Sequence, residues 1–541
     1  MMLCTQAFTE LHSLSESEPR VLLANTNLQN RAPVVVARIL ARVLSMQNND
    51  SSWGPRGCAE TTAYAIITLL IVIALPYVQA LRMEIEHAIA KGRQVMALMH
   101  ESWTKPHDLW VGKVAYGSVA LSQAFSLAAM TKPIYEGPRQ EKMRTAIDKQ
   151  TQEILGLSRF FSNLEHLKRE PQSMIKASVL EAVFYQPSLK AMRTKIFPQT
   201  RANGKDKYLD YIPIMWIIPS TCDAIFSPPE YLLDMMVLSM FIFLVDEYLE
   251  SNVAQFSTDE LEAFRQSVQK THPEENLLAI DLSFPGFQHA KDMNTPAGKD
   301  QMTRSSSDRL GEAISVFQNW ATTVMKYPRV KDASRSDLLE LRSETKRYIL
   351  YHLTQIQDNA RFAKQDLSAS TQFLTPRTSY QTWVHTVGAG PISGPFSFAF
   401  FVCSMGGCAR HGADCYTHVR QKIIAYNMDT HIGAYCRMYN DYGSITRDLE
   451  ERNLNSVNFP EFFVDRLDPD SSKATLIDLA KYERQCAADT AEVLIRDLRA
   501  EDSVGRKIAD CLRVYIGASN GFSDMYVTRD VTKRVKHSLS N

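Results

Sequence analysis

Three oxygen-bearing side chains recur at every fourth residue in one stretch of the chain: Asn440, Ser444 and Asp448. On a helix of 3.6 residues per turn this spacing places them on one face, with a drift of about 40° per step. An amide oxygen, a hydroxyl and a carboxylate in a row suit a hard cation such as Mg²⁺, which prefers oxygen ligands and often shares them with substrate phosphates. Polar residues at this spacing also line ordinary solvated helix faces, so the triplet alone leaves both interpretations open.

A second group of acidic residues ends a long apolar stretch, residues 231–250, YLLDMMVLSMFIFLVDEYLE. Asp246 and Glu250 are four residues apart, and Glu247 lies beside them. Three carboxylates at the end of a buried helix would repel one another and would be costly to desolvate unless a cation neutralised them. The alternative is a helix end that emerges into water, where acidic residues are common.

Together the two groups resemble the paired metal-binding motifs of class I terpene synthases. DEYLE (246–250) stands where that family has its aspartate-rich DDxxD motif, with Glu in the second and fifth positions. NDYGSITRD (440–448) stands where the family has its (N/D)Dxx(S/T)xxxE motif, with the shorter Asp in the last position. The resemblance implies a Mg²⁺ cofactor, roughly three ions, held against a prenyl diphosphate substrate. It assigns two metal-binding walls, Asp246, Glu247 and Glu250 on one side and Asn440, Ser444 and Asp448 on the other.

The closer likeness is to the C-terminal, kaurene-synthase-like half of fungal bifunctional copalyl diphosphate/ent-kaurene-type diterpene synthases. It covers most of residues 170–535. Besides the two motifs, the similar segments are YLDYIPIMW (208–216), QIQDNARFAKQ (355–365), TWVHTVGAG (382–390), NLNSVNFPEF (453–462) and MYVTRD (525–530).

The resemblance also implies basic residues that close over the diphosphate. Arg437 precedes the second motif by three residues and Arg447 lies inside it, while Arg361 and Arg529 are further candidates. Arginine can bind phosphate oxygens through two hydrogen bonds, although each of these residues could instead be a surface ion-pair partner. His385 stands where the fungal enzymes generally carry Arg, so it is either a weaker diphosphate contact or a packed core histidine.

Composition limits the classes of function. Of 541 residues, 45% are hydrophobic and 22% are charged, which is typical of a globular protein with a sizeable core. The 60 basic residues balance 60 acidic ones, and basic residues do not cluster with aromatic ones, so we expect no nucleic-acid binding. The nine scattered cysteines lack the paired spacing of a zinc site and favour a reduced, cytoplasmic protein.

One apolar stretch, residues 63–81, is long enough to cross a bilayer. Thr68, Pro76 and Gln79 interrupt it, which favours a buried helix, and we therefore expect no stable membrane insertion. The beginning of the chain carries Glu10, Glu16 and no apolar signal core, so a secretory leader is not expected.

Apolar residues recur at three- and four-residue intervals through most of the chain, which predicts an all-α fold. The resemblance divides it into a class I terpenoid synthase helical bundle at residues 133–541 and a truncated remnant of the class II helical barrel at residues 1–132. The segments SMQNNDSSWG (45–54), CAETTAYAIITLL (58–70) and KVAYGSVALSQAFSLAAM (113–130) resemble the end of the class II half. The DxDD acid motif of class II chemistry does not occur in the sequence, so we expect no protonation-initiated reaction from this part unless another chain completes it.

Three functional hypotheses follow. The first is a class I diterpene synthase, a lyase that ionises a copalyl-type diphosphate and cyclises the carbocation, with functional coupling to a class II diterpene cyclase that supplies the substrate. The second is direct use of geranylgeranyl or farnesyl diphosphate. The third is a non-catalytic relic or a partner of a class II cyclase.

Overall fold

The computed structural model describes residues 2, 5, 6, 26–54, 58–107, 109–111, 114–135, 141–193, 208–270, 306–463 and 469–528. Contacts divide the chain into two compact units. The first unit comprises Met1–Ala191, Lys205–Val237 and Asp510–Asn541, and the second comprises Met192–Gly204 and Leu238–Ala509. The boundary predicted at residue 132 separates a class II-like segment from a class I-like segment by resemblance. This division stays a prediction.

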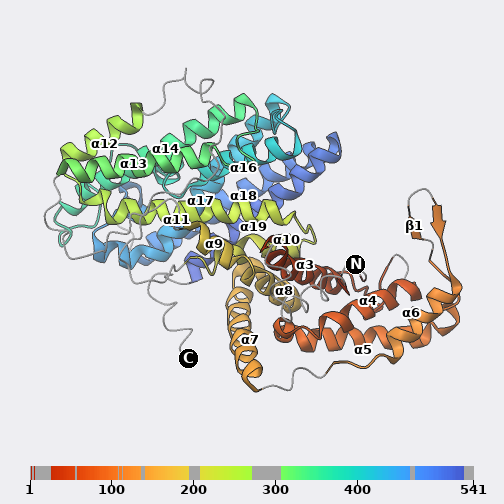
Figure 1. Ribbon diagram of the computed structural model, residues 1–541. Coiled ribbons are helices and arrows are strands. Elements are labelled where there is room, and N and C mark those ends of the chain that lie inside the picture. The colour runs from red at the N-terminus through yellow and green to blue at the C-terminus, as the bar shows by residue number, and fades with distance from the viewer. Residues whose placement is uncertain are drawn as a thin grey trace. The chain divides into compact units, whose positions relative to one another are not determined.

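The first unit is built from helices and one small hairpin (Figure 1). Its main helices are α3 (Thr26–Ser45), α4 (Ala59–Val72), α5 (Arg82–Leu98), α6 (Val119–Thr131), α7 (Glu141–Ser162), α8 (Gln172–Val183), α10 (Ile212–Cys222) and most of α9 (Gln186–Arg193) and α19 (Ser503–Thr528). Short 3-10 helices lie at Pro76–Leu81, His100–Ser102 and Glu165–Leu167. The predicted all-α fold is confirmed, and its one exception among the described residues is the antiparallel pair β1 (Leu109–Val111) and β2 (Val114–Tyr116).

The apolar stretch 63–81 is interrupted where the sequence suggested. Helix α4 ends at Val72, and a 3-10 helix begins at Pro76, whose ring cannot continue the backbone ladder. In the described part of the chain, no single helix is both long and apolar enough to cross a membrane. The pair Ala59–Val72 and Pro76–Leu98 meets those criteria only when it is taken together, and it is bent by 119°.

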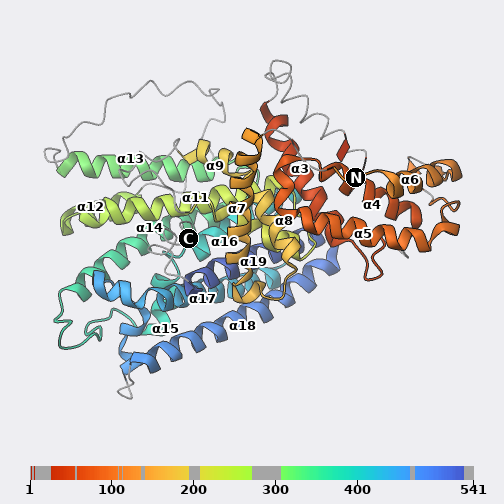
Figure 2. The ribbon, with the colours of Figure 1, turned by 90° about the horizontal axis from the view of Figure 1, so that it is seen from below.

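The second unit carries both predicted motifs. Its helices are the later part of α11 (Pro229–Ser251), α12 (Thr258–Lys270), α13 (Ser306–Met325), α14 (Arg335–Ala363), α15 (Tyr380–Trp383), α16 (Gly394–Ala409), α17 (Val419–Glu451), α18 (Pro469–Glu501) and the start of α19. A π-helical turn, η6 (Val384–Gly388), follows α15, and short 3-10 helices lie at Val253–Gln255, Ser456–Asn458 and Pro460–Phe463. Figure 2 shows the two 33-residue helices α17 and α18 running alongside each other.

An aromatic cluster forms part of the core of this unit and orients α14. Tyr348 of α14 stacks on Phe396 of α16 with ring centroids 5.2 Å apart, and Trp320 of α13 lies 5.3 Å from the same ring. All three rings are almost completely buried. Burying such rings stabilises the packing, and offset or tilted pairs add to it. The tyrosine hydroxyl is thereby fixed in direction.

Between η6 and α16 the helix is broken. Ser393 adopts a left-handed conformation with a φ of 68°, and α16 begins at Gly394 with Pro395 in its first turn. Gly390 lies against the ring of Tyr351, where a Cβ would come within 2.1 Å of a ring carbon. The break therefore requires a residue without a side chain at position 390.

Candidate functional site

Helix α11 presents the first acidic group. The Tyr348 hydroxyl donates a 2.5 Å hydrogen bond to Oδ1 of Asp246, and Nε2 of His352 lies 3.1 Å from the same oxygen. The histidine contact is close but is not aligned as a hydrogen bond. Burial and the neighbouring Asp246 carboxylate raise the pKa of Tyr348 well above its usual value, so its hydroxyl remains a donor. Two side chains of α14 thus approach one oxygen of Asp246.

The pKa of Glu250 is affected by charged residues on both α11 and α17, the helices that carry the motifs. Desolvation, followed by the charge of Asp246, raises its pKa to about 6, although part of its side chain is exposed to solvent. His352 and Arg447 lower this pKa and Glu451 raises it, so these charges are near enough to Glu250 to act on it. Because Arg447 and Glu451 belong to α17, the ends of α11 and α17 approach each other. Glu247 is half-buried on the same turn of α11.

Helix α17 carries the second group. Ser444 and Asp448 are 5% and 7% exposed, and the serine hydroxyl donates to Oδ2 of Asp448 at 2.6 Å. The Asn455 amide donates to the same oxygen at 2.8 Å, and a guanidinium nitrogen of Arg447 lies 3.6 Å from Oδ1. Asn440 is half-buried two turns earlier. Asn440, Ser444 and Asp448 lie on one helix, as the sequence predicted.

Asp441, which sequence reasoning left out, is the most deeply buried carboxylate of this helix end. Ser456 donates to its Oδ2 through both its backbone N–H at 2.9 Å and its hydroxyl at 2.6 Å. Nε of Arg437 lies 2.9 Å from Oδ1, as an ion pair without hydrogen-bond alignment. Burial raises the pKa of Asp441, whereas Arg437 lowers it. The Arg437 guanidinium also lies over the Trp383 ring, 4.9 Å from its centroid.

The segment after α17 supplies these donors. Arg452 ends the helix in a left-handed conformation with a φ of 60°, and the chain turns back so that Asn455 and Ser456 face Asp441 and Asp448. These two residues belong to the NLNSVNFPEF segment that carries the resemblance. Their types gave a signal, since Asn and Ser commonly satisfy polar groups just beyond a helix end, but their partners could not be read from spacing.

The remaining basic candidates are placed as follows. The Arg361 guanidinium donates to the Thr375 carbonyl, lies 3.4 Å from Asp358 and covers the Phe373 ring at 5.7 Å. Arg361 therefore fastens the segment that follows α14. Arg529 lies outside the described residues.

His385 lies on η6 and contacts α18. Its Nε2 is 3.2 Å from Oε1 of Glu483, and its Nδ1 is 2.9 Å from the Gln381 carbonyl. The hydrogen bond with Glu483 raises the pKa of His385, and the two histidines that face Glu483, His385 and His431, lower the pKa of that carboxyl against the effect of burial. His385 is thus half-buried in an ion pair.

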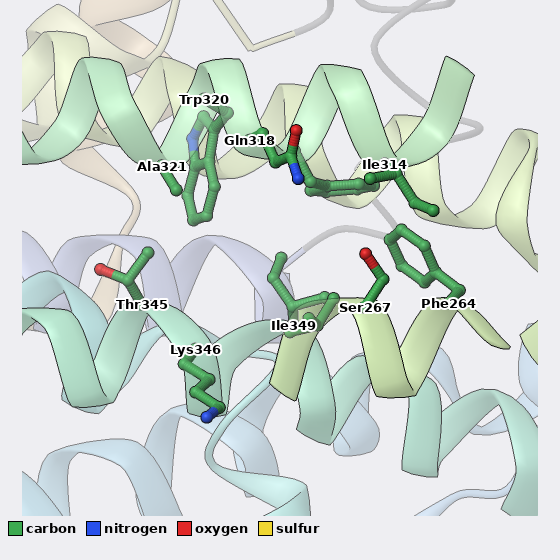
Figure 3. A pocket seen from close by; sticks show the side chains of 11 residues that line it. Phe264, Ser267, Ile314, Gln318, Trp320, Ala321, Thr345, Lys346 and Ile349 are labelled. Atoms are coloured by element: carbon green, nitrogen blue, oxygen red, sulfur yellow. The ribbon is translucent and has the colours of Figure 1, made fainter. Parts of the chain in front are cut away.

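A separate pocket lies between α12, α13 and α14 of the second unit, with about 420 Å³ of empty space that is partly open to solvent (Figure 3). Aromatic and aliphatic side chains such as Phe264, Trp320 and Ile349 line it, and Lys346 lies at one side. None of the six predicted metal ligands belongs to its lining. It is therefore distinct from the acidic site.

The second unit as described is a helical bundle that carries two acidic, oxygen-rich groups, one on α11 and one on α17. No family model matches the chain. Comparison with curated proteins finds relatives along nearly its whole length.

The pimaradiene synthase of Emericella nidulans is 29% identical over 534 residues, which cover 97% of this chain and 54% of that protein. The ent-kaur-16-ene synthase of Fusarium fujikuroi is 28% identical over 557 residues, which cover 99% of this chain and 55% of that protein. The bifunctional premutilin synthase of Clitopilus passeckerianus is 27% identical over 511 residues, which cover 92% of this chain and 50% of that protein. The chain spans about half the length of these relatives. It is a homologue of fungal diterpene synthases, which confirms the predicted resemblance.

Proposed function

We propose that the chain is a class I diterpene synthase that ionises a copalyl-type diphosphate and cyclises the resulting carbocation to a polycyclic diterpene. The observation that carries the proposal is that both oxygen-rich groups lie in the same unit, on α11 and α17, and that the charges of Arg447 and Glu451 on α17 shift the pKa of Glu250 on α11. The homology to diterpene synthases supports the same reaction class. The reaction releases diphosphate, and the remaining hydrocarbon cation rearranges before it loses a proton or gains water.

The donor set fits Mg²⁺. All six proposed ligands offer oxygen, which this hard cation prefers. Asp246 raises the pKa of Glu250, so the two carboxylates repel each other, and a cation between them would relieve that repulsion. We propose that Asp246, Glu247 and Glu250 hold the metal from α11, and that Asn440, Ser444 and Asp448 hold it from α17. Bound Mg²⁺ supplies Lewis-acid stabilisation of the charge that grows on the departing diphosphate.

The chain's own residues position these ligands. Tyr348 directs one oxygen of Asp246, and Asn455 and Ser444 direct one oxygen of Asp448. Such outer contacts fix the orientation of carboxylate ligands. We propose Arg447 as the basic residue nearest the diphosphate, because its charge acts on Glu250 of one wall and it lies within the motif of the other. Arg437 and His385, both already paired with carboxylates, are proposed as secondary contacts.

Residues 1–541 hold no DxDD motif, so we propose that the copalyl-type diphosphate comes from a class II active site outside these residues and that residues 1–132, which resemble the end of a class II half, take no part in catalysis.

The test is incubation of the purified chain with Mg²⁺ and, separately, ent-, normal and syn-copalyl, geranylgeranyl and farnesyl diphosphates, with products identified by gas chromatography and mass spectrometry. A cyclic hydrocarbon or alcohol from one copalyl isomer is expected. Products only from geranylgeranyl or farnesyl diphosphate would replace the proposed substrate. If the folded chain gave no product from any of these substrates, the result would favour the hypothesis of a non-catalytic relic or partner of a class II cyclase.

A further inference from the structure

A second ligand cluster lies apart from the acidic motifs. His385 of η6, His431 of α17 and Glu483 of α18 each offer one ligand atom, and these atoms all lie within 4.8 Å of one another. Nδ1 of His431 is 2.6 Å from Oε2 of Glu483, and Nε2 of His385 is 3.2 Å from Oε1. Among the residues that the structure describes, this is the one such grouping of His, Cys, Asp and Glu ligand atoms.

The hydrogen bond of His385 to the backbone defines its tautomer. A carbonyl oxygen can only accept, so Nδ1 of His385 must donate its hydrogen to Gln381. In the neutral ring, Nε2 then carries a lone pair directed at a carboxylate oxygen of Glu483, and two acceptors face each other. Either a second proton or a metal ion must lie between them. A histidine whose other nitrogen is bonded to a backbone carbonyl is the common arrangement for metal-ligating histidines.

The ligands are held by rigid elements. His431 and Glu483 lie within two 33-residue helices that pack against each other, as Figure 2 shows. His385 lies on a π-helical turn, a local departure from α-helix that is often found at functional sites. The three side chains are 24%, 29% and 11% exposed in chain order, so an ion could enter from solvent.

The donor set differs in kind from that of the acidic walls. Two imidazole nitrogens and one carboxylate match zinc-class ions, whereas Mg²⁺ prefers oxygen alone. Two histidines and one carboxylate leave a fourth position for water.

We propose that Nε2 of His385, Nδ1 of His431 and a carboxylate oxygen of Glu483 form a binding site for one zinc-class ion, which ties the π turn to α17 and α18. None of its three ligands is among the six proposed Mg²⁺ ligands, but an ion bound there would occupy the His385 side chain that is otherwise proposed as a secondary diphosphate contact. Binding would replace any proton between His385 and Glu483, since imidazole ligates metal only in its neutral form.

The test is a titration of the chelator-treated, full-length chain with Co²⁺ and Zn²⁺ in the presence of excess Mg²⁺. Calorimetry gives the stoichiometry, and the visible absorption of Co²⁺ reports its ligands. One equivalent should bind, with a Co²⁺ spectrum that Zn²⁺ abolishes. His431→Ala and Glu483→Gln should each weaken binding on the order of 100-fold. His87→Ala, which removes an exposed histidine of α5, should leave binding unchanged.

Absence of stoichiometric binding by the folded wild-type chain would overturn the proposal. So would binding that persists at wild-type affinity in Glu483→Gln, which keeps the size of the side chain, or in His431→Ala. Circular dichroism checks that each variant is folded. The titration contains no prenyl diphosphate, so its outcome does not depend on whether the chain is a diterpene synthase.

Discussion

Tyr348 and His352 approach the same oxygen of Asp246 from one face of α14. The sequence predicted Asp246 because its motif is local, with carboxylates four residues apart on one helix. It did not predict Tyr348 or His352. Tyr348 lies 102 residues after Asp246 in the chain, and neither residue belongs to a motif. A contact of this kind depends on how two helices pack. Residue spacing alone does not contain that information.

The Tyr348 hydroxyl should matter more for metal binding than for packing. Tyr348→Phe keeps the ring that stacks on Phe396 but removes the donor to Asp246. We expect the turnover of whichever prenyl diphosphate the wild-type chain converts to fall about 10–100-fold. A higher Mg²⁺ concentration should be needed for the half-maximal rate. Tyr426→Phe, at an exposed position of α17, is the matched control. An unchanged Mg²⁺ dependence in Tyr348→Phe would remove the tyrosine from the proposed site.

Asn455 holds the end of α17 by donating to the Asp448 carboxylate and to the Asp441 carbonyl. Asn455→Ala leaves both buried acceptors short of a donor, which should cost about 1–3 kcal/mol in the free energy of unfolding and also lower turnover. Urea unfolding and initial rates measure the two effects. Asn319→Ala on the exposed face of α13 should change neither. If Asn455→Ala were as stable and active as wild type, the segment after α17 would not position the second motif.

Among the elements, the break between η6 and α16 restricts the residue type most strongly, because a side chain at Gly390 would overlap its neighbour. The structure places a π turn within the TWVHTVGAG segment and the left-handed Ser393 just beyond it. The sequence did not predict the close packing at this break: a Cβ at Gly390 would overlap the Tyr351 ring, and a Cβ at Gly394 would lie 3.0 Å from Cα of Gly433. Close backbone approach is a tertiary property, and the residue type only permits it.

Gly390→Ala should test this packing. The added Cβ would overlap the Tyr351 ring, so we expect a loss of about 1–3 kcal/mol or more in the free energy of unfolding. Gly311→Ala, within α13, meets nothing within 4 Å and should instead be neutral or stabilising by up to about 1 kcal/mol. Denaturant unfolding of the two variants side by side makes the comparison. Equal stability of Gly390→Ala and Gly311→Ala would contradict the close approach.

For the whole molecule, the periodicity of apolar residues predicted an all-α chain, and this is confirmed because helical packing leaves a strong local pattern. The hairpin β1–β2 was missed, since three-residue strands are too short to show alternation. The division into two units was not predicted in this form either: segments 205–237 and 510–541 group with the first unit although they are distant in sequence. Homology fixes the ancestry of a segment, whereas compactness depends on long-range contacts.

The stability of the first unit should depend on pH through Glu181 of α8. Burial raises the pKa of this carboxyl to about 7 from an ordinary value of 4.5, and Arg38, whose Nη1 lies 3.8 Å from it, only partly opposes the shift. Between these values the folded chain binds more protons than the unfolded chain, so stability should fall as pH rises from about 4.5 to about 7 and then level off. The full effect is at most about 3 kcal/mol.

Glu181→Gln should flatten this pH dependence, as measured by urea midpoints at a series of pH values. Glu153→Gln at an exposed site on α7 should retain the wild-type profile. A Glu181→Gln profile as steep as that of wild type would assign the dependence to other groups.

The central claim is that the groups on α11 and α17 together ionise an allylic diphosphate. The most direct measurement is therefore diphosphate release from the copalyl isomers with and without Mg²⁺, by the wild-type chain and by Asp246→Ala, Asn440→Ala and the control Tyr426→Phe. The account predicts Mg²⁺-dependent release from one isomer, lowered at least about 100-fold in both motif variants and retained in the control. Release that ignores Mg²⁺, or that persists when either motif is removed from a folded chain, would contradict it.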